Sequence, residues 1–269
     1  MSPALIPFLA AMPLLSLFGS SPRPSDWPAS LADVRVEIQI EHSSERGDDT
    51  RDSSSASIKA VLYHAKGRAI ERRDVALEVN GVPLEFRVGT GNYYDRYPYY
   101  RLPPDSPLQI TPAHTYRFVL VTPDAVKHLV GEVTTPERLE LEQFTYPRQS
   151  PAGPVVLTWR DLAEPAQLTV YRSNRWREGV NVFVNEAGSP TDPAALRRQI
   201  GGGLFRQKSD TWTVPATFLQ PIDSHEMSAL AVDIRVTRTG RVEKTFAKAS
   251  TLRAERWLTL RMVVPEKPQ

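Results

Sequence analysis

The chain has 269 residues, a formal net charge of +2 and no cysteine. This length is typical of two domains of ordinary size, and a nearly neutral charge does not favour a nucleic-acid-binding protein, which usually carries a clustered basic face. Without cysteine the chain can form no disulfide, no thiolate nucleophile and no cysteine-ligated zinc or iron–sulfur site.

The N-terminus begins with a hydrophobic segment. Ala4 to Phe18 is apolar except for Ser16, and Pro7 and Pro13 interrupt it. A membrane-spanning helix needs about 20 residues, whereas this shorter length suits the hydrophobic region of a secretory signal. We therefore predict that residues 1–20 are a leader and that the protein is periplasmic or secreted, in contact with a membrane only through the leader if it is not cleaved. The alternative is a hydrophobic terminus of a cytosolic protein.

The end of this segment resembles the leader of a bacterial lipoprotein. Leu17-Phe18-Gly19-Ser20 is similar to the box at which such leaders are cleaved, but Ser20 stands where the lipid-acceptor cysteine should be. Without a thiol no thioether lipid anchor can form at this position. We therefore expect a product that carries no lipid.

The first domain is predicted at residues 33–136, after a linker rich in proline and serine at residues 21–32. Apolar and polar residues alternate from Val34 to Ile40, which is the pattern of a half-buried strand. A second strand is predicted from Ile58 to Tyr63, and the polar stretch from Glu45 to Ser55 is predicted to be a loop.

A β-hairpin is predicted in the middle of this domain. Apolar residues alternate from Val75 to Val79 and again from Leu84 to Val88, and Asn80-Gly81 lies between the two runs. Asn-Gly is favoured in two-residue type I′ turns because both central residues need positive φ.

The segment from Ile110 to Tyr116 contains a turn at Pro112, and Tyr116 then opens the apolar strand that ends at Val121. This order resembles the tyrosine corner of immunoglobulin-like sandwiches, in which the tyrosine hydroxyl bonds to backbone a few residues upstream. The resemblance implies such a bond for Tyr116. A closing strand from Leu129 to Thr134 and a domain boundary at Thr135-Pro136 are predicted next.

The second domain is predicted at residues 137–269. Pro154 to Trp159, followed by Leu168 to Ser173, resembles the early strands of fibronectin type III modules, in which a buried tryptophan packs against the next strand. The chain departs from that pattern in an insertion at residues 174–210, where Asp192-Pro193 predicts the start of a short helix over Ala194 to Ile200.

The remaining strands are predicted from Ser228 to Arg238 and from Trp257 to Val264, with a turn at Thr239-Gly240. Together these elements predict an all-β fold. It consists of two consecutive antiparallel β-sandwich domains, similar to immunoglobulin and fibronectin type III modules, with one short helix in the second. Such sandwiches host unrelated functions, so the resemblance concerns fold only.

Five of the nine tyrosines fall in the eight residues from Tyr93 to Tyr100. Tyrosine and arginine are enriched at binding hot spots, whereas adjacent residues of a strand face opposite sides. We therefore expect two or three exposed rings, the others filling the edge of a sandwich; the alternative is that all the rings are core. The candidate binding residues are Tyr93, Tyr94, Arg96, Tyr97, Tyr99, Tyr100 and Arg101.

The sequence contains no Gly-x-Ser-x-Gly elbow, and no two of its five histidines lie within ten residues of each other. We therefore expect no catalytic residue, no cofactor and no metal. The predicted function is that of an exported, non-catalytic envelope protein, which acts as a spacer and binds an unknown protein or glycan partner but no nucleic acid. The alternatives are an accessory or carbohydrate-binding unit of an envelope enzyme system, and an enzyme with a dispersed carboxylate site.

Overall fold

The computed structural model describes residues 26–46, 53–65, 67–90, 96–147, 155–162, 164–173, 177–184, 204–207, 210–214 and 229–263. The helices in these ranges are two 3-10 turns, η1 (Leu31–Asp33) and η3 (Leu141–Gln143), and the remaining regular structure is β. The predicted all-β class is therefore confirmed. None of the described helices is long and apolar enough to cross a membrane. The predicted leader and the predicted helix over Ala194 to Ile200 lie outside the described residues.

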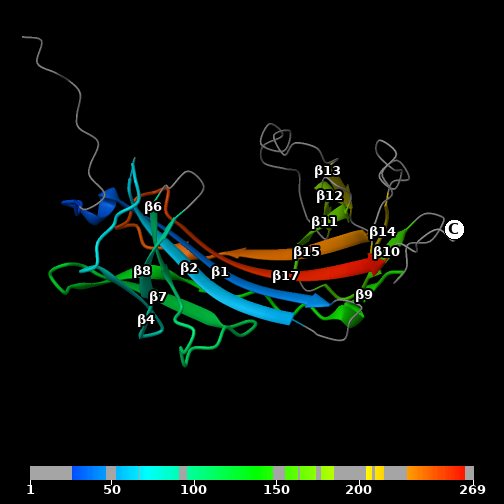
Figure 1. Cartoon of the computed structure of the whole chain (residues 1–269), viewed down its shortest axis with the longest axis horizontal. Helices are drawn as coiled ribbons and strands as arrows, with labels where there is room; N and C mark the ends of the chain where they lie inside the picture. Colours follow the sequence, from blue (N-terminus) through cyan, green and yellow to red (C-terminus); the bar gives the residue numbers. More distant parts are fainter. Residues whose placement is uncertain are drawn as a thin grey trace, which may run out of the picture.

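One long sheet runs through the molecule in the order β13-β12-β11-β15-β17-β1-β2-β6-β5. Its strands are paired antiparallel except for β1 with β17 and β12 with β13, which are parallel. Figure 1 shows β1, β2, β15 and β17 side by side along the long axis, while β6 and β11–β13, towards the two ends of the strand order, rise on the same side. In chain order the strands are β1 (Val34–Arg46), β2 (Ser53–His64), β5 (Glu85–Thr90), β6 (Arg96–Arg101), β11 (Ala166–Ser173), β12 (Arg177–Val184), β13 (Leu204–Gln207), β15 (Ala229–Thr239) and β17 (Thr251–Val263).

Two smaller sheets cover parts of the long sheet. The five-stranded sheet has the order β16-β8-β7-β3-β4, and Figure 1 shows β7 and β8 below β1 and β2. The three-stranded sheet has the order β14-β10-β9. Their strands are β3 (Ala76–Val79), β4 (Val82–Pro83), β7 (Thr115–Val121), β8 (Lys127–Thr134), β9 (Phe144–Thr145), β10 (Val156–Trp159), β14 (Thr211–Thr213) and β16 (Arg241–Val242).

The first core lies between the long sheet and the five-stranded sheet. Alternation along β1 places its even-numbered residues inward, because successive side chains of a strand point to opposite faces. The predicted strand from Val34 to Ile40 is confirmed in this way, and it continues to Arg46. The buried residues of the long sheet in this core are Val34, Val36, Ile38, Ile40, Ile58, Ala60, Leu62, Tyr100, Leu252 and Ala254, and they meet Leu77, Val79, Tyr116, Phe118, Leu120, Val130 and Val133.

The second core lies between the other end of the long sheet and the three-stranded sheet. Trp159 is buried in it, in agreement with its predicted place near the end of a strand. The other buried residues are Phe144, Val155, Leu157, Ala166, Leu168, Val170, Trp212, Val214, Val232, Ile234, Val236, Leu258, Leu260 and Met262. Even-numbered residues of β17, all on one face of the strand, are therefore buried in both cores.

The Asn80-Gly81 turn is confirmed, since φ is 49° at Asn80 and 80° at Gly81. The hairpin around it is shorter than predicted. β3 pairs with β4 over only two residue pairs, and β5 then leaves this sheet and pairs with β6 in the long sheet. The predicted turn at Thr239-Gly240 also leads from one sheet to another, because β15 belongs to the long sheet whereas β16 pairs with β8.

Three other boundaries differ from the predictions. The predicted loop from Glu45 to Ser55 is partly strand, because β1 and β2 remain paired as far as Glu45 and Ser53. The predicted linker is partly packed, because the large apolar side chains of Trp27 and Leu31 lie against the first core. The insertion at residues 174–210 contains strands β12 and β13, which extend the long sheet beyond β11.

The division into domains at residues 136 and 137 stays a prediction, but β16 and β17 of the predicted second domain pair with strands of the first. Phe246, Leu252 and Ala254 belong to the first core although they lie in the predicted second domain. β17 pairs in parallel with β1 from Glu37↔Thr251 to Arg46↔Leu260. The two cores therefore share one backbone ladder.

Tyr116 forms the predicted corner. Its ring is fully buried, its hydroxyl accepts a hydrogen bond from the Thr111 backbone N–H at 2.7 Å, and it donates one to the Gln109 carbonyl oxygen at 2.9 Å. The hydroxyl thus satisfies two backbone groups at once and fixes the turn that precedes β7.

Replacing Tyr116 by Phe should therefore lower the free energy of unfolding by about 1–3 kcal/mol, because both backbone groups lose their partner. Urea denaturation measures the change. Tyr97→Phe is the matched control, since that ring is exposed, and its effect should stay within about 0.5 kcal/mol. Equal midpoints for the two variants would contradict the corner.

Candidate functional site

Two tyrosines of β6 lie on the face of the long sheet opposite to the cores, which neither of the two smaller sheets covers; we call it the open face. Tyr100 points inward, with 2 % of its surface exposed, so Tyr97 and Tyr99 point outward. Tyr97 is 42 % exposed, the two rings are stacked with centroids 5.7 Å apart, and their planes differ by 24°. We call Tyr97, Tyr99 and Lys59 the aromatic platform.

Gly89 allows the Tyr97 ring to lie flat on the sheet. It is the direct cross-strand partner of Tyr97, on the neighbouring strand β5. A Cβ placed on Gly89 would lie 2.4–2.6 Å from the far end of the Tyr97 ring, much closer than carbon atoms can approach. Aromatic residues commonly cover glycines in sheets in this way, and Gly89 thus leaves the space that the Tyr97 ring occupies.

Lys59 supplies a positive charge to the platform from the adjacent strand β2. Its Nζ lies 5.5 Å from the Tyr97 ring centroid and 5.6 Å from that of Tyr99, within the range of a cation–π interaction. No ion pair joins Lys59 to a described carboxylate. The Lys59 ammonium group is therefore available to a ligand that binds on the two rings.

A charged cluster borders the platform on strands β5 and β6. The Glu85 carboxylate pairs with Arg87 at 2.5 Å and with Arg101 at 3.0 Å. Hydrogen bonds from these two guanidinium groups, Arg87 first, hold the pKa of Glu85 below its usual range. Together with Lys59 the cluster contains three cations and one anion.

The predicted binding residues are thus divided between surface, core and undescribed chain. Tyr97, Tyr99 and Arg101 lie together on the open face, as described above. Tyr100 belongs to the core, where its hydroxyl donates a hydrogen bond to the Val75 carbonyl oxygen at 3.1 Å and burial raises its pKa. Arg96 begins β6, and its side chain is outside the described set, as are Tyr93 and Tyr94 altogether.

A second polar cluster on the same open face was not predicted. The Arg235 guanidinium lies 4.6 Å from the Trp257 ring centroid and pairs with Glu255, whose carboxylate also accepts a hydrogen bond from Gln39 Nε2 at 3.2 Å. These residues come from β15, β17 and β1. Only the pairing register brings them together, so no local sequence pattern could have indicated the cluster.

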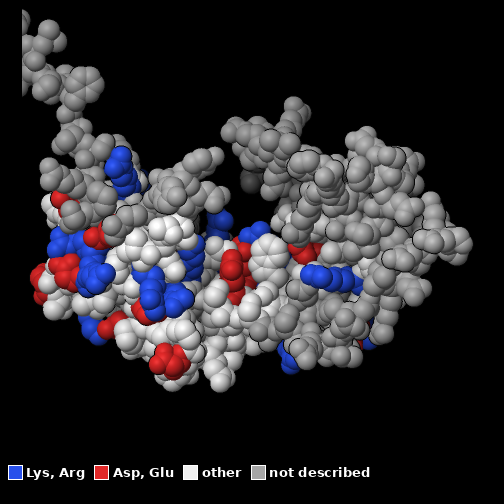
Figure 2. Space-filling view, viewed as in Figure 1, with Lys and Arg blue, Asp and Glu red and all other residues white. Residues whose placement is uncertain are grey.

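Charges of both signs lie on the described surface. Figure 2 shows basic and acidic side chains mixed over it in this view. The Trp257 cluster and the aromatic platform adjoin at Gln39, which donates a hydrogen bond to Glu255 and is the direct cross-strand partner of Lys59. An extended ligand along this face could reach both.

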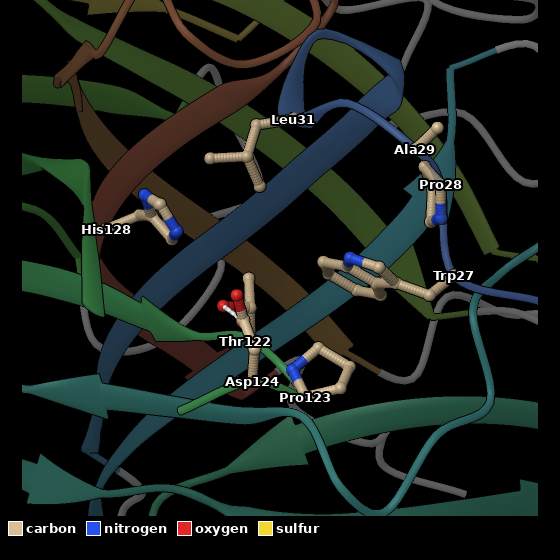
Figure 3. A pocket seen from close by; sticks show the side chains of 8 residues that line it. All are labelled: Trp27, Pro28, Ala29, Leu31, Thr122, Pro123, Asp124 and His128. Atoms are coloured by element: carbon tan, nitrogen blue, oxygen red, sulfur yellow. Dashed lines mark hydrogen bonds between the residues drawn. The ribbon is translucent and has the colours of Figure 1, made fainter. Parts of the chain in front are cut away.

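A separate cavity of about 430 Å³ lies beside the first core, away from the tyrosines. Figure 3 shows Trp27 and Leu31 from the N-terminal segment facing Pro123 of the β7–β8 connection and His128 of β8. Thr122 donates a hydrogen bond to Asp124 there at 2.5 Å, which holds the pKa of Asp124 low. The cavity thus marks where the predicted linker packs on the domain.

No protein-family model and no curated protein matches this chain. The resemblance to immunoglobulin and fibronectin type III modules therefore stays a prediction from the sequence. Among the described residues, no three histidine, aspartate or glutamate side chains are grouped as a metal site would require.

Proposed function

We propose that the protein is a non-catalytic binding module of the cell envelope and that the aromatic platform takes a glycan. The observation that carries the proposal is the stacked pair Tyr97–Tyr99, with Tyr97 packed over Gly89 and Lys59 beside both rings. A sugar ring has apolar C–H faces that pack on aromatic rings, while its hydroxyls accept hydrogen bonds from cationic side chains.

Preorganisation supports this proposal over a purely structural role for the rings. Binding loses less free energy when the contacting groups are already fixed, and both tyrosines are held on a strand of the long sheet. The adjoining Arg87 and Arg101 provide further donors that could orient a polar ligand. A protein partner is the second candidate, since exposed tyrosine and arginine also form hot spots between proteins.

The described acids of the open face favour binding over catalysis. Glu255 is paired with Arg235, Asp233 accepts a hydrogen bond from Thr259 at 2.8 Å, and Glu85 is held by two arginines. A carboxylate that acts as a general acid needs its pKa raised towards neutrality, whereas the pKa of Glu85 is lowered. Glu255 and Glu85 thus hold neighbouring cations, and Asp233 holds a hydroxyl.

Binding is tested by co-sedimentation with purified peptidoglycan sacculi and by affinity electrophoresis in gels that contain neutral or uronic-acid polysaccharides. The double change Tyr97→Ala and Tyr99→Ala should weaken retention by about 30-fold, corresponding to roughly 2 kcal/mol for a hot spot. Tyr97→Phe keeps the ring and should retain binding. Gly89→Ala keeps every tyrosine but displaces the Tyr97 ring, so it should reduce binding as well. Retention of all variants at wild-type strength would refute the glycan site.

Export is the second part of the proposal and rests on the apolar segment from Ala4 to Phe18. Mass spectrometry of the protein from its native host should find a mature chain that begins between Gly19 and Asp33, in a periplasmic or secreted fraction. An intact Met1 in the cytosol would disprove export while leaving the glycan site untouched.

A further inference from the structure

The inward face of the long sheet is apolar in both cores but carries basic side chains between them. Along β17 the inward residues are Leu252 and Ala254 in the first core and Leu258 and Leu260 in the second, but Arg256 stands between them. On β1 the apolar series of the first core ends at Ile40 and His42 follows. Arg256 and His42 are direct partners in the parallel ladder, so two basic side chains lie next to each other at the junction.

Arg256 is buried without a partner that neutralises it. Only 4 % of its surface is exposed, and no hydrogen bond or ion pair joins its guanidinium to another described residue. Burying a charge is costly unless it is paired and hydrogen-bonded. Burial and then the charge of Arg138 lower the pKa of Arg256, and the charge of Glu140 opposes them only in part.

Arg238, on the neighbouring strand β15, has the acceptors that Arg256 lacks. Its guanidinium pairs with Glu164 at 2.5 Å and donates a hydrogen bond to the Thr135 carbonyl oxygen at 3.1 Å. Arg238 is also less buried than Arg256, with 31 % of its side chain exposed. The more deeply buried arginine is thus the one that lacks an acceptor.

His42, beside Arg256, also has a buried polar atom without a hydrogen-bond partner. His42 Nδ1 is buried and has no hydrogen-bond partner, and burial followed by the charge of Arg256 lowers the pKa of His42. The nearby Glu140 carboxylate is bound to Arg138 at 2.8 Å, and the Arg138 side chain is 70 % exposed. Arg256 and His42 Nδ1 therefore both lack a hydrogen-bond partner among the described residues, and the exposed side chain of Arg138 lies nearest to solvent.

We propose that the junction between the two cores binds a small oxyanion, held by Arg256 and His42 with Arg138 at its outer side. A planar guanidinium offers a fork of N–H donors that fits two oxygens of a phosphate or sulfate group, and the imidazole adds a third donor. Because the site lies on the covered face of the sheet, it is independent of the aromatic platform. An anion bound here would neutralise the junction and join β1 to β17.

The test is thermal denaturation of the full chain in phosphate and in chloride at equal ionic strength. The wild-type midpoint should rise with phosphate concentration and saturate, as mass action requires for one site. Arg256→Met should abolish the rise, and Arg138→Met should raise the half-saturating concentration roughly tenfold. Arg253→Met is the matched control, because Arg253 is exposed on the opposite face of the same strand, and it should respond as the wild type does.

Equal rises in all variants would mean an adventitious ion only, and no rise in the wild type would also overturn the site. If Arg256→Met fails to fold, nuclear magnetic resonance of the wild type decides instead. Phosphate should raise the pKa of His42 and shift its ring resonances saturably, with His42→Gln used to assign them. Ring resonances that do not change with phosphate would contradict the proposal.

Discussion

The structure depends on the parallel pairing of β1 with β17. These strands come from opposite ends of the described chain, and their ladder runs from Glu37↔Thr251 to Arg46↔Leu260. β1 supplies the first core, and β17 supplies both. Without this ladder the long sheet would separate into two sheets, each with a new unpaired edge, which is a hazard for aggregation.

The same ladder explains why one face of the sheet is available for binding. Both smaller sheets cover the face that carries even-numbered residues of β1 and β17, so the odd-numbered residues remain uncovered by them. Lys59, Tyr97 and Tyr99 lie on that uncovered face, and so do Arg235 and Trp257. The shared ladder thus sets one open surface over both cores, with an aromatic ring beside a cation at two places along it.

The local elements of this fold could be predicted from sequence, whereas its long-range connections could not. The alternation from Val34 to Ile40, the Asn80-Gly81 turn and the corner at Tyr116 are all encoded within a few residues, and each is confirmed. The partner of β1 is not encoded locally, because Ile38 and Leu252 become neighbours only through the pairing register. For the candidate site, strand alternation correctly predicted that Tyr99 and Tyr100 face opposite sides of the sheet. The role of Gly89 could not be predicted, because it depends on the pairing of β5 with β6. The cluster at Arg235 needs three strands to form, so it could not be seen in the sequence.

The central claim is that β1 and β17 join the two cores into one cooperative unit. Native-state hydrogen exchange read by mass spectrometry at increasing urea concentrations tests it directly. Peptides from β2 and β7, in the first core, should lose protection at the same urea concentration as peptides from β11 and β15, in the second. Two separate transitions, with one core exchanging fully while the other stays protected, would contradict the claim and favour two independent domains.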